Sequence, residues 1–477
     1  MSRPYHIVIL GGGAAGLTVA AGAASLGARV ALVERAPHLG GDCLHYGCVP
    51  SKSLIAAAKK LHTMKMAARQ FGVNCAGDGN FMAAFDHVRE VIEKLQQHDS
   101  LVRFQQLGVD IFQCKGRIHS PRVVETDTGH LLRGKSVVIA TGSSPVIPSI
   151  QGLNSVNYLT NESIFSITSL PKRLAILGGG PIGVEMAQAF ARFGTQVTLL
   201  ETRDQLLPHE DRDIVRDVES VLARELVIMK QAQVTEISKS PDGAKSLKLL
   251  IGGEPRTLIV DEVLVAVGRK PNTENLGLEQ LGMKMNGAYV SVDTRLRTSV
   301  PHHYAIGDVV EPYPFTHVAA MEAKVVIANA LFGLPRKVNY DHVPWVVYTD
   351  PEIYHLGYTE QQARNRYGDR VKVYEVALSD VDRFVMGGEG SGRVKVITDH
   401  RGKIIGAHAA GQHAGDWMQM VGYAKMLGKP LSHLSLQIYP YPVRAMAVQQ
   451  VADLVWREKL FSGMIQRLIR GYISLFR

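Results

Sequence analysis

The chain has 477 residues, more than one ordinary hydrophobic core organises, so two or three domains are expected. Hydrophobic residues make up 46% and charged residues 20%, which indicates a folded protein and excludes disorder, collagen and coiled coil as the main architecture. The net charge of +9 would suit nucleic acid or an anionic membrane, but no basic stripe interleaved with aromatic residues and no zinc spacing supports a nucleic-acid partner.

Membrane-spanning and secreted classes are also disfavoured. No apolar run approaches the roughly 20 residues that a transmembrane helix needs. The N-terminus lacks the charged and apolar regions of a signal peptide. Four cysteines do not make a secreted disulfide scaffold in a chain of this length. We therefore expect a cytoplasmic protein in which any disulfide is redox-active.

The N-terminal segment shows a strand–loop–helix–strand pattern. His6–Leu10 is a short apolar run typical of a buried parallel strand, and Gly11–Gly16 leads into an alanine-rich helix. A second strand, Arg29–Val33, ends at the acidic residue Glu34.

The same pattern returns later in the chain. Leu174–Leu177 is followed by the loop Gly178–Gly183, a helix, and the strand Gln196–Leu200, which ends at Glu201. The acid follows the first glycine at the same offset in both copies. Such glycines permit a tight turn, close approach of backbone N–H groups to a pyrophosphate, and close strand–helix contact, while the carboxylate binds a ribose diol. Two full copies predict two dinucleotide-binding folds.

Two cysteines, Cys43 and Cys48, lie in the glycine-containing segment Gly40–Lys52, just after the first ribose acid. Cysteines at this spacing can meet across the irregular first turn of a helix, and a helix N-terminus lowers the pKa of a thiol. The alternatives are two ordinary cysteines or half of a metal site. No further cysteine or histidine cluster completes such a site, so we expect a redox pair and no metal. Cys75 and Cys114 have no motif around them and are expected to be plain reduced residues.

The character of the chain changes past about residue 344. After Tyr348–Glu352, alternating stretches at 371–376, 394–397 and 404–407 predict antiparallel strands, and helical patterns follow from about Ala414. These patterns predict a third domain of the α+β class.

The cysteine segment resembles the redox-active disulfide of the class I pyridine nucleotide–disulfide oxidoreductases, a family that includes dihydrolipoamide dehydrogenase and mercuric reductase. The likeness runs from about residue 5 to about residue 450. Ile139–Ser143 is similar to the family's linking strand, and Val267–Asn272 to its return from the NAD domain. Ala305–Asp308 resembles the segment whose aspartate holds the FAD ribityl chain, and His317–Ala319 the piece beside the flavin.

The resemblance implies an α/β fold with two Rossmann-like dinucleotide-binding domains, for FAD and NAD, plus a C-terminal α+β dimerisation domain. The expected boundaries are 1–152 and 272–343 for the FAD domain, 153–271 for the NAD(P)H domain, 344–453 for the dimerisation domain and 454–477 for a basic amphipathic tail. It also implies a homodimer in which Tyr439–Met446 of one subunit faces the cysteine pair of the other.

By the same resemblance, electrons pass from a nicotinamide to FAD and then to a Cys43–Cys48 disulfide. Cys48 would be the flavin-facing thiolate, and Cys43 would attack the acceptor. Lys52 would lie near the flavin N5 and pair with Glu185, because a buried lysine needs such a partner. The alternative for Glu185 is an ordinary residue on a helix surface.

Candidate cofactor residues follow from the glycine loops and the resemblance. For FAD they are Gly11, Gly13, Ala14, Ala15, Gly16, Glu34, Arg35, Gly41, Lys52, Gly116, Ala140, Thr141, Gly142, Arg269, Gly307, Asp308, His317 and Ala319. For NAD they are Gly178, Gly180, Ile182, Gly183, Glu201, Arg203 and Gly268. Because the Glu201 carboxylate would repel a 2′-phosphate, NADH is expected; NADPH is the alternative, with Arg203 as the group that would accept its phosphate.

The likeness breaks near the C-terminus. Disulfide reductases of this family carry a His-Pro and a glutamate there, which protonate the departing thiolate. In this chain Tyr439 or Tyr441, each followed by proline, overlays the histidine, and the acid position becomes Arg444 or Met446. A tyrosine has a pKa near 10 and is a poor proton shuttle at neutral pH.

The expected function is therefore that of an NADH-dependent flavoenzyme with a disulfide-like or thiophilic acceptor, which would be a small molecule, a metal ion or a redox protein. One alternative is a mercuric-type metal-ion reductase. A non-enzymatic alternative is a flavin-bound redox sensor or a partner-binding protein recruited to a membrane.

The basic tail motivates the membrane alternative. On one continuous helical wheel Lys459, Arg467, Arg470 and Arg477 share an arc of about 80°, with apolar side chains around the remainder. A helix of this kind can lie in an anionic membrane surface, here the inner face of the membrane. The alternative is a helix docked on its own domain or on a dimer partner.

Overall fold

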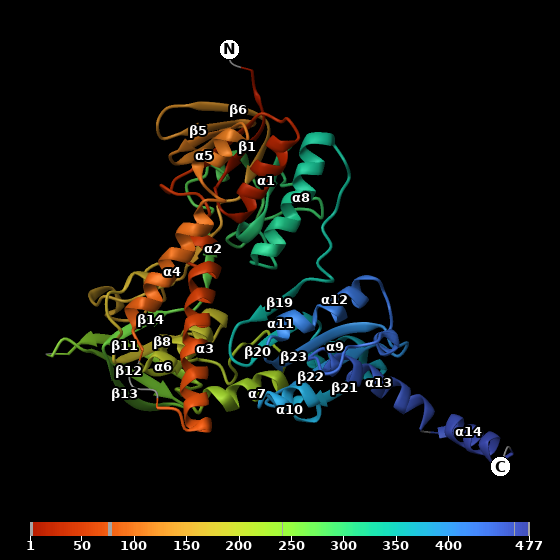
Figure 1. Cartoon of the computed structure of the whole chain (residues 1–477). Helices are drawn as coiled ribbons and strands as arrows, with labels where there is room; N and C mark the ends of the chain where they lie inside the picture. The colour runs from red at the N-terminus through yellow and green to blue at the C-terminus, as the bar shows by residue number, and fades with distance from the viewer. Residues whose placement is uncertain (1–2, 75–78, 241, 462, 476–477) are drawn as a thin grey trace. The chain divides into compact units, whose positions relative to one another are not determined.

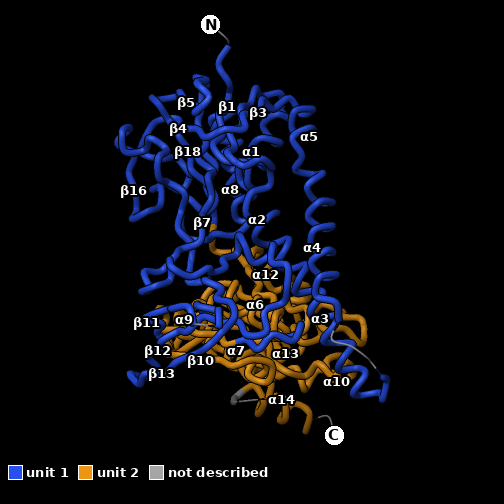
Figure 2. Tube along the Cα trace, turned by 90° about the vertical axis from the view of Figure 1, so that its left-hand side faces the viewer, with its two compact units in different colours: residues 1–178, 192–197, 233–339 blue, residues 179–191, 198–232, 340–477 orange. Residues whose placement is uncertain are grey.

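The computed structural model describes residues 3–74, 79–240, 242–461 and 463–475 (Figure 1). It divides into two compact units (Figure 2). Unit 1 holds residues 1–178, 192–197 and 233–339, and unit 2 holds residues 179–191, 198–232 and 340–477. This division does not test the domain boundaries expected from the sequence, which stay predictions. Cys75 and Arg477 lie outside the described residues.

Unit 1 contains the first dinucleotide-binding fold. Its sheet consists of β1 (Tyr5–Leu10), β2 (Val30–Glu34), β3 (Val109–Gln113), β4 (Gly116–Ser120), β5 (Val123–Thr126), β6 (Leu131–Ile139) and β18 (His303–Ala305). The strand order is β3-β2-β1-β6-β5-β4, with β18 also pairing with β6. Pairing among β1, β2, β3, β6 and β18 is parallel, whereas β4 and β5 are antiparallel. Helices α1 (Ala14–Ser25) and α8 (Thr316–Phe332) contribute to one hydrophobic cluster with this sheet.

The first copy of the repeat matches its prediction. β1 and β2 are buried along almost their whole length, as expected for parallel strands covered on both faces. Between β2 and β3 the chain forms α2 (Gly41–His45), α3 (Cys48–Phe71), α4 (Phe81–Gln96) and α5 (Leu101–Gln106). Two small antiparallel pairs complete this part: β7 (Ser143–Pro145) with β15 (Arg269–Pro271), and β16 (Met285–Asn286) with β17 (Tyr289–Val290).

The second copy of the repeat is also present. Its elements are β8 (Arg173–Leu177), α6 (Pro181–Phe193), β9 (Gln196–Leu200), α7 (Arg212–Leu222), β10 (Val227–Met229) and β14 (Glu262–Val265). Within unit 1, β14 pairs in parallel with β8, and within unit 2, β10 pairs in parallel with β9. A further sheet has the order β11 (Ala232–Lys239), β12 (Lys245–Ile251) and β13 (Glu254–Val260).

The C-terminal part of unit 2 is an antiparallel sheet covered by helices, which confirms the predicted α+β character. The strand order is β19 (Pro344–Val347), β20 (Glu352–Gly357), β23 (Ile404–Gly411), β22 (Arg393–Thr398) and β21 (Lys372–Ala377). The helices are α9 (Glu360–Tyr367), α10 (Asp382–Met386), α11 (Ala414–Trp417), α12 (Gln419–Met426) and α13 (Met446–Leu460).

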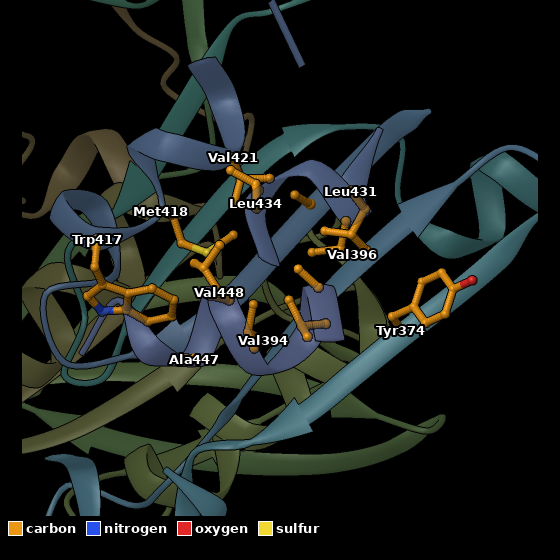
Figure 3. Packing of buried hydrophobic residues seen from close by; sticks show 14 of the residues in the cluster. Tyr374, Val394, Val396, Trp417, Met418, Val421, Leu431, Leu434, Ala447 and Val448 are labelled. Carbon is orange, nitrogen blue, oxygen red and sulfur yellow. The ribbon is translucent and has the colours of Figure 1, made fainter. Parts of the chain in front are cut away.

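One hydrophobic core joins this sheet to its helices. Figure 3 shows Val394 and Val396 of β22 packed with Met418, Val421 and Val448 from the helical segments. Because side chains alternate along a strand, residues between these valines face the opposite side of the sheet.

The C-terminal tail is not one continuous helix. Helix α13 ends at Leu460, and α14 (Gly463–Leu475) begins after a break, so Lys459 lies on a different helix from Arg467 and Arg470. Large apolar side chains of α14, among them Leu468 and Tyr472, are exposed. The interaction with an anionic surface stays a prediction. Within the described ranges, no helix combines the length and apolarity that crossing a bilayer requires.

Candidate active site

The two cysteines meet beside the first glycine loop. Cys43 lies within α2, and Cys48 is the first residue of α3, with a short turn between the two helices. Glycine suits this turn, because a Cβ on Gly47 would lie 3.0 Å from the carbonyl oxygen of Asp42 and 2.8 Å from its Oδ2. A Cβ on Gly41, whose φ is +59°, would lie 2.7 Å from the Cα of Gly13. The segment therefore lies close against the loop that the sequence assigns to FAD.

A threonine hydroxyl contacts both sulfurs. Thr316 Oγ1 donates to Cys43 Sγ at 3.2 Å and lies 3.6 Å from Cys48 Sγ. Thr316 opens α8 and was not among the predicted site residues, although it directly precedes the predicted His317. The two thiols also hydrogen-bond to each other.

The pKa values of the two thiols are shifted in opposite directions. The hydrogen bond from Cys43, with help from Thr316 and the charge of Lys52, lowers the pKa of Cys48 to about 6; partial desolvation by the surrounding protein opposes this, although the Cys48 side chain is exposed in the single chain. The hydrogen bond to Cys48, together with burial, raises the pKa of Cys43 above its ordinary value. At neutral pH the reduced pair therefore carries a thiolate at Cys48 and a thiol at Cys43.

A polar network extends from Asp42, the residue before Cys43. Its Oδ1 accepts a hydrogen bond from Asn161 Nδ2 at 3.0 Å and forms an ion pair with Arg269 at 3.1 Å. Arg269 also donates to the Ser143 hydroxyl at 2.7 Å, and Ser143 in turn donates to Asp308 Oδ2 at 2.5 Å. The predicted residues Arg269 and Asp308 are thus brought together. Asp42, Asn161 and Ser143 were not predicted as site residues.

The first glycine loop and its acid form a cradle that fits FAD. Glu34 accepts hydrogen bonds from the backbone N–H groups of Gly12 at 2.5 Å and Ala36 at 2.7 Å. A Cβ on Gly16 would lie 1.9 Å from the carbonyl oxygen of Gly11, so only glycine allows this approach. Beside Glu34 and Arg35 lies a cavity of about 220 Å³. Its lining includes Gly11, Gly116 and Thr141, as expected for an adenosine-binding end.

The second glycine loop repeats this arrangement. Glu201 accepts hydrogen bonds from the N–H groups of Gly179 at 2.8 Å and Arg203 at 2.9 Å, as Glu34 does in the first copy. Gly178 has φ +108°, and its Cβ would lie 2.4 Å from Ala266 O, the equivalent of Gly11 against Ala140. Of the other predicted residues, Ile182 and Gly183 lie in α6, and Gly180 and Gly268 have open space around their Cα atoms. The local geometry suits a pyrophosphate at this loop.

Lys52 and Glu185 belong to different units. Lys52 lies on α3 one turn after Cys48, where its charge favours the thiolate. Glu185 is only 3% exposed and accepts a hydrogen bond from the backbone N–H of Tyr348 at 2.8 Å, so it is not an exposed helix-surface residue. The pairing of Lys52 with Glu185 stays a prediction.

The stretch Tyr439–Met446, which aligns with the family's His-Pro and glutamate, contains no carboxylic acid, and both of its tyrosines donate hydrogen bonds. Tyr439 donates to Leu434 O at 3.1 Å, and burial raises its pKa to about 12. Tyr441 donates to Asp382 at 3.0 Å, which raises its pKa. Arg444 holds Glu389 through three hydrogen bonds, from Nε to Oε2 at 2.9 Å and from Nη2 to Oε1 at 2.8 Å and to Oε2 at 2.7 Å.

Comparisons with known proteins agree with this geometry. The chain is 32% identical over 471 residues to a dihydrolipoyl dehydrogenase of Bacillus subtilis, covering 95% of this chain and 98% of that protein. It is 30% identical to a mercuric reductase of Lysinibacillus sphaericus, covering 94% and 82%. A solved structure, the Cu(II) complex of the HOCl-induced flavoprotein disulfide reductase RclA from Escherichia coli, matches with a TM-score of 0.85 and 28% identity, covering 95% of this chain and all of that one.

Family models account for most of the chain. Residues 5–323 match the model of the pyridine nucleotide-disulphide oxidoreductases, and residues 343–452 match the dimerisation domain of the same family. The predicted fold class, with its C-terminal dimerisation domain, is confirmed. The chain is therefore a member of the pyridine nucleotide-disulphide oxidoreductase family.

Proposed function

We propose that this oxidoreductase takes electrons from NADH and delivers them, through FAD and the Cys43–Cys48 pair, to a disulfide-like or thiophilic acceptor. Members of the family use FAD and NAD(P)H. The observation that carries the proposal is the contact of two thiols of opposite acidity with each other and with one hydroxyl, that of Thr316. Two cysteines without such contacts would have similar pKa values.

The two sulfurs have separate roles in this proposal. When bound, FAD would supply hydride acceptance from the nicotinamide and two-electron reduction of the disulfide. The Cys43–Cys48 disulfide takes up two electrons and one proton, which gives a Cys43 thiol and a Cys48 thiolate. As the Cys43 sulfur attacks a disulfide acceptor, its proton moves along the hydrogen bond to Cys48, and the first thiolate of the acceptor leaves. That thiolate takes the proton from Cys48, and the Cys48 thiolate then attacks the Cys43 sulfur, which releases the second thiolate of the acceptor and restores the disulfide.

The surroundings of Cys43 favour an acceptor that needs no added proton. Among the described side chains, no histidine or carboxylate hydrogen-bonds to Cys43. Tyr439 ionises too far above neutral pH to act as a proton shuttle. A metal ion lowers the pKa of a thiol that coordinates it, and the released proton goes to water, so reduction of a soft metal ion needs no protein base here. This favours metal-ion reduction as the second candidate function, in line with the mercuric reductases among the relatives.

A homodimer is part of the proposal. Ile438 is 94% exposed and Leu436 69% exposed in the single chain, within the segment matched by the dimerisation domain. Exposed apolar side chains of this size are typical of an interface. Sedimentation equilibrium should give twice the chain mass, and Ile438→Asp should shift the protein toward the monomer. A monomer at all concentrations of the unaltered chain would contradict the dimer.

The electron route is tested by rapid mixing of the anaerobic, FAD-containing protein with NADH. We expect a long-wavelength thiolate-to-flavin absorbance that disappears on adding a suitable acceptor from a panel of Hg²⁺, Cu²⁺, glutathione disulfide, lipoamide and quinones. Absence of this absorbance would refute the route through the cysteines.

A pair of serine variants assigns the attacking sulfur. Cys43→Ser should abolish reduction of the acceptor and leave slow reoxidation by oxygen. Cys75→Ser is the matched control, because Cys75 has no motif around it in the sequence, and its turnover should equal that of the unaltered chain. Equal turnover in the Cys43→Ser protein would show that Cys43 does not attack the acceptor.

A further inference from the structure

A row of polar side chains crosses the face of the C-terminal sheet opposite the hydrophobic core. The pairing registers align Trp345 with His355, His355 with His408, His408 with Lys395, and Lys395 with Glu375, so that each of the five strands contributes one residue. His355, His408 and Lys395 are almost fully buried. Helix α7 and the loop before it pack on this face within unit 2.

Three groups of this region converge on one point. The ligand atoms of Glu210, His355 and His408 all lie within 4.8 Å of one another. Glu210 is 6% exposed, His355 2% and His408 0%. His355 Nδ1 lies 2.8 Å from Glu210 Oε2. The other carboxylate oxygen, Oε1, accepts a hydrogen bond from the Trp345 indole at 2.6 Å.

The second nitrogen of each histidine is held by the backbone. His355 Nε2 lies 2.9 Å from Gly357 O, and His408 Nε2 lies 2.9 Å from Tyr358 O. A carbonyl oxygen only accepts, so both Nε2 atoms carry protons, and the Nδ1 atom of His408 is left as an acceptor. This Nδ1 atom is buried and has no hydrogen-bond partner among the residues that the structure describes. A buried polar atom without a partner is costly and calls for an explanation.

We propose that Glu210, His355 and His408 bind one divalent transition-metal ion, with Zn²⁺ as the natural probe, through Oε2 and the two Nδ1 atoms. Histidines that bind metals commonly donate their other N–H to a backbone carbonyl, which is the arrangement of both histidines here. Two imidazoles and one carboxylate suit Zn²⁺ and its neighbours better than Ca²⁺ or Mg²⁺, which prefer oxygen ligands. The proton that His355 shares with Glu210 leaves as the metal binds.

The surroundings are compatible with this ion. His408 donates from Nε2 to Tyr358 O and leaves Nδ1 buried without a partner in the described part of the chain, which fits the neutral imidazole that a metal ligand must be. The Trp345 ring stacks on His355 with 3.6 Å between ring centroids and limits the positions that His355 can adopt. The nearby Lys395 ammonium is paired with carboxylates, including Asp211 at 3.0 Å and Asp213 at 2.6 Å, and presents no uncompensated charge to the site.

The ligands must shift slightly when the ion binds. Metal–ligand distances of about 2.0–2.1 Å in a tetrahedral site place neighbouring ligand atoms about 3.3 Å apart. His355 Nδ1 and Glu210 Oε2, now 2.8 Å apart, must separate by about 0.5 Å, and the upper limit of 4.8 Å requires the other pairs to close by about 1.5 Å at most. The sequence indicated no metal site, because these residues come from three distant segments and share no spacing.

The test uses the full-length, FAD-containing protein with Cys43→Ser and Cys48→Ser, so that thiolates do not compete for the metal. We expect equilibrium dialysis against Zn²⁺, followed by elemental analysis, to leave one zinc ion per chain. X-ray absorption at the zinc edge should show only nitrogen and oxygen ligands, including imidazole. Failure of this parent protein to retain stoichiometric zinc would overturn the proposal.

Variants in the same background locate the ion. Glu210→Gln and His408→Gln should lose it, and Trp345→Phe, which removes the hydrogen bond to Glu210 but keeps an aromatic ring beside His355, should weaken zinc affinity about 10–100-fold. His303→Gln is the matched control, because His303 is also fully buried with an unpartnered ring nitrogen but lies in unit 1. Circular dichroism without zinc checks that each variant is folded. If Glu210→Gln or His408→Gln fails to fold, the zinc affinity of the Trp345→Phe variant tests the assignment instead. Unchanged zinc affinity in folded Glu210→Gln or Trp345→Phe would place the ion elsewhere and refute the assignment.

Discussion

Replacing Cys43 by serine and by alanine isolates the hydrogen bond that stabilises the Cys48 thiolate. This hydrogen bond is the largest cause of the lowered pKa of Cys48, about 6. Serine keeps an O–H donor at position 43, and alanine keeps none. A hydrogen bond to a charged group contributes about 1.5–3 kcal/mol, and one pKa unit corresponds to about 1.4 kcal/mol. Because Cys48 is exposed in the chain, the lower figure applies, and the alanine variant should have a Cys48 pKa about one unit above that of the serine variant.

The assay uses the thiolate itself. Neither variant can form the disulfide, so Cys48 stays a single thiol. In the proposed arrangement it faces bound FAD, and its thiolate-to-flavin absorbance then reports ionisation between roughly pH 5 and pH 9. The thiolate fraction rises with pH in both proteins, and the alanine curve should lie at the higher pH. Coincident curves, or a serine variant that titrates near the ordinary thiol value of about 8.5, would refute the role given to the hydrogen bond.

Three further substitutions test the packing, the glycine loop and the choice of nicotinamide. Lys395→Met leaves the buried carboxylate of Asp211 without its cation and should lower the free energy of unfolding, measured in urea, by about 3–5 kcal/mol. Lys248→Met, which breaks an exposed ion pair, should lower it by less than about 1 kcal/mol. Similar losses of stability in both variants would contradict this prediction. Gly16→Ala, whose Cβ would lie 1.9 Å from a backbone oxygen, should yield protein without bound flavin by absorbance, while Gly471→Ala, with open space around it, should retain flavin. Glu201→Ala should lower kcat/KM for NADH about ten-fold, as loss of one hydrogen bond predicts, and spare NADPH; equal losses for both would indicate loop damage instead.

Local order explains what the sequence predicted well. Strand, glycine loop, helix and acid are consecutive in both copies of the repeat, and the structure reproduces them, including the carboxylate that binds the second loop N–H group. The cysteine pair was predicted for the same reason, because Cys43 and Cys48 are close in the chain and a helix begins at the second.

Contacts between distant segments explain what was missed. Thr316 contacts both sulfurs from α8, and Asn161 contacts Asp42 from a loop, and neither carries a motif of its own. The row of polar side chains across the C-terminal sheet could not be predicted from the sequence, because each of the five strands contributes only one of its residues. The tail was treated as one helix, but Gly463, a poor helix former, begins a new one.

The polar row also constrains how the C-terminal sheet assembles. A slip of one residue in the pairing of β20 or β23 would turn His355 or His408 toward the apolar core and leave the carboxylate of Glu210 facing Tyr354 and Leu356 or alanine methyl groups. A sheet misaligned by one residue would thus carry an unpaired carboxylate in its interior. The row of polar side chains therefore favours the native strand register over registers shifted by one residue.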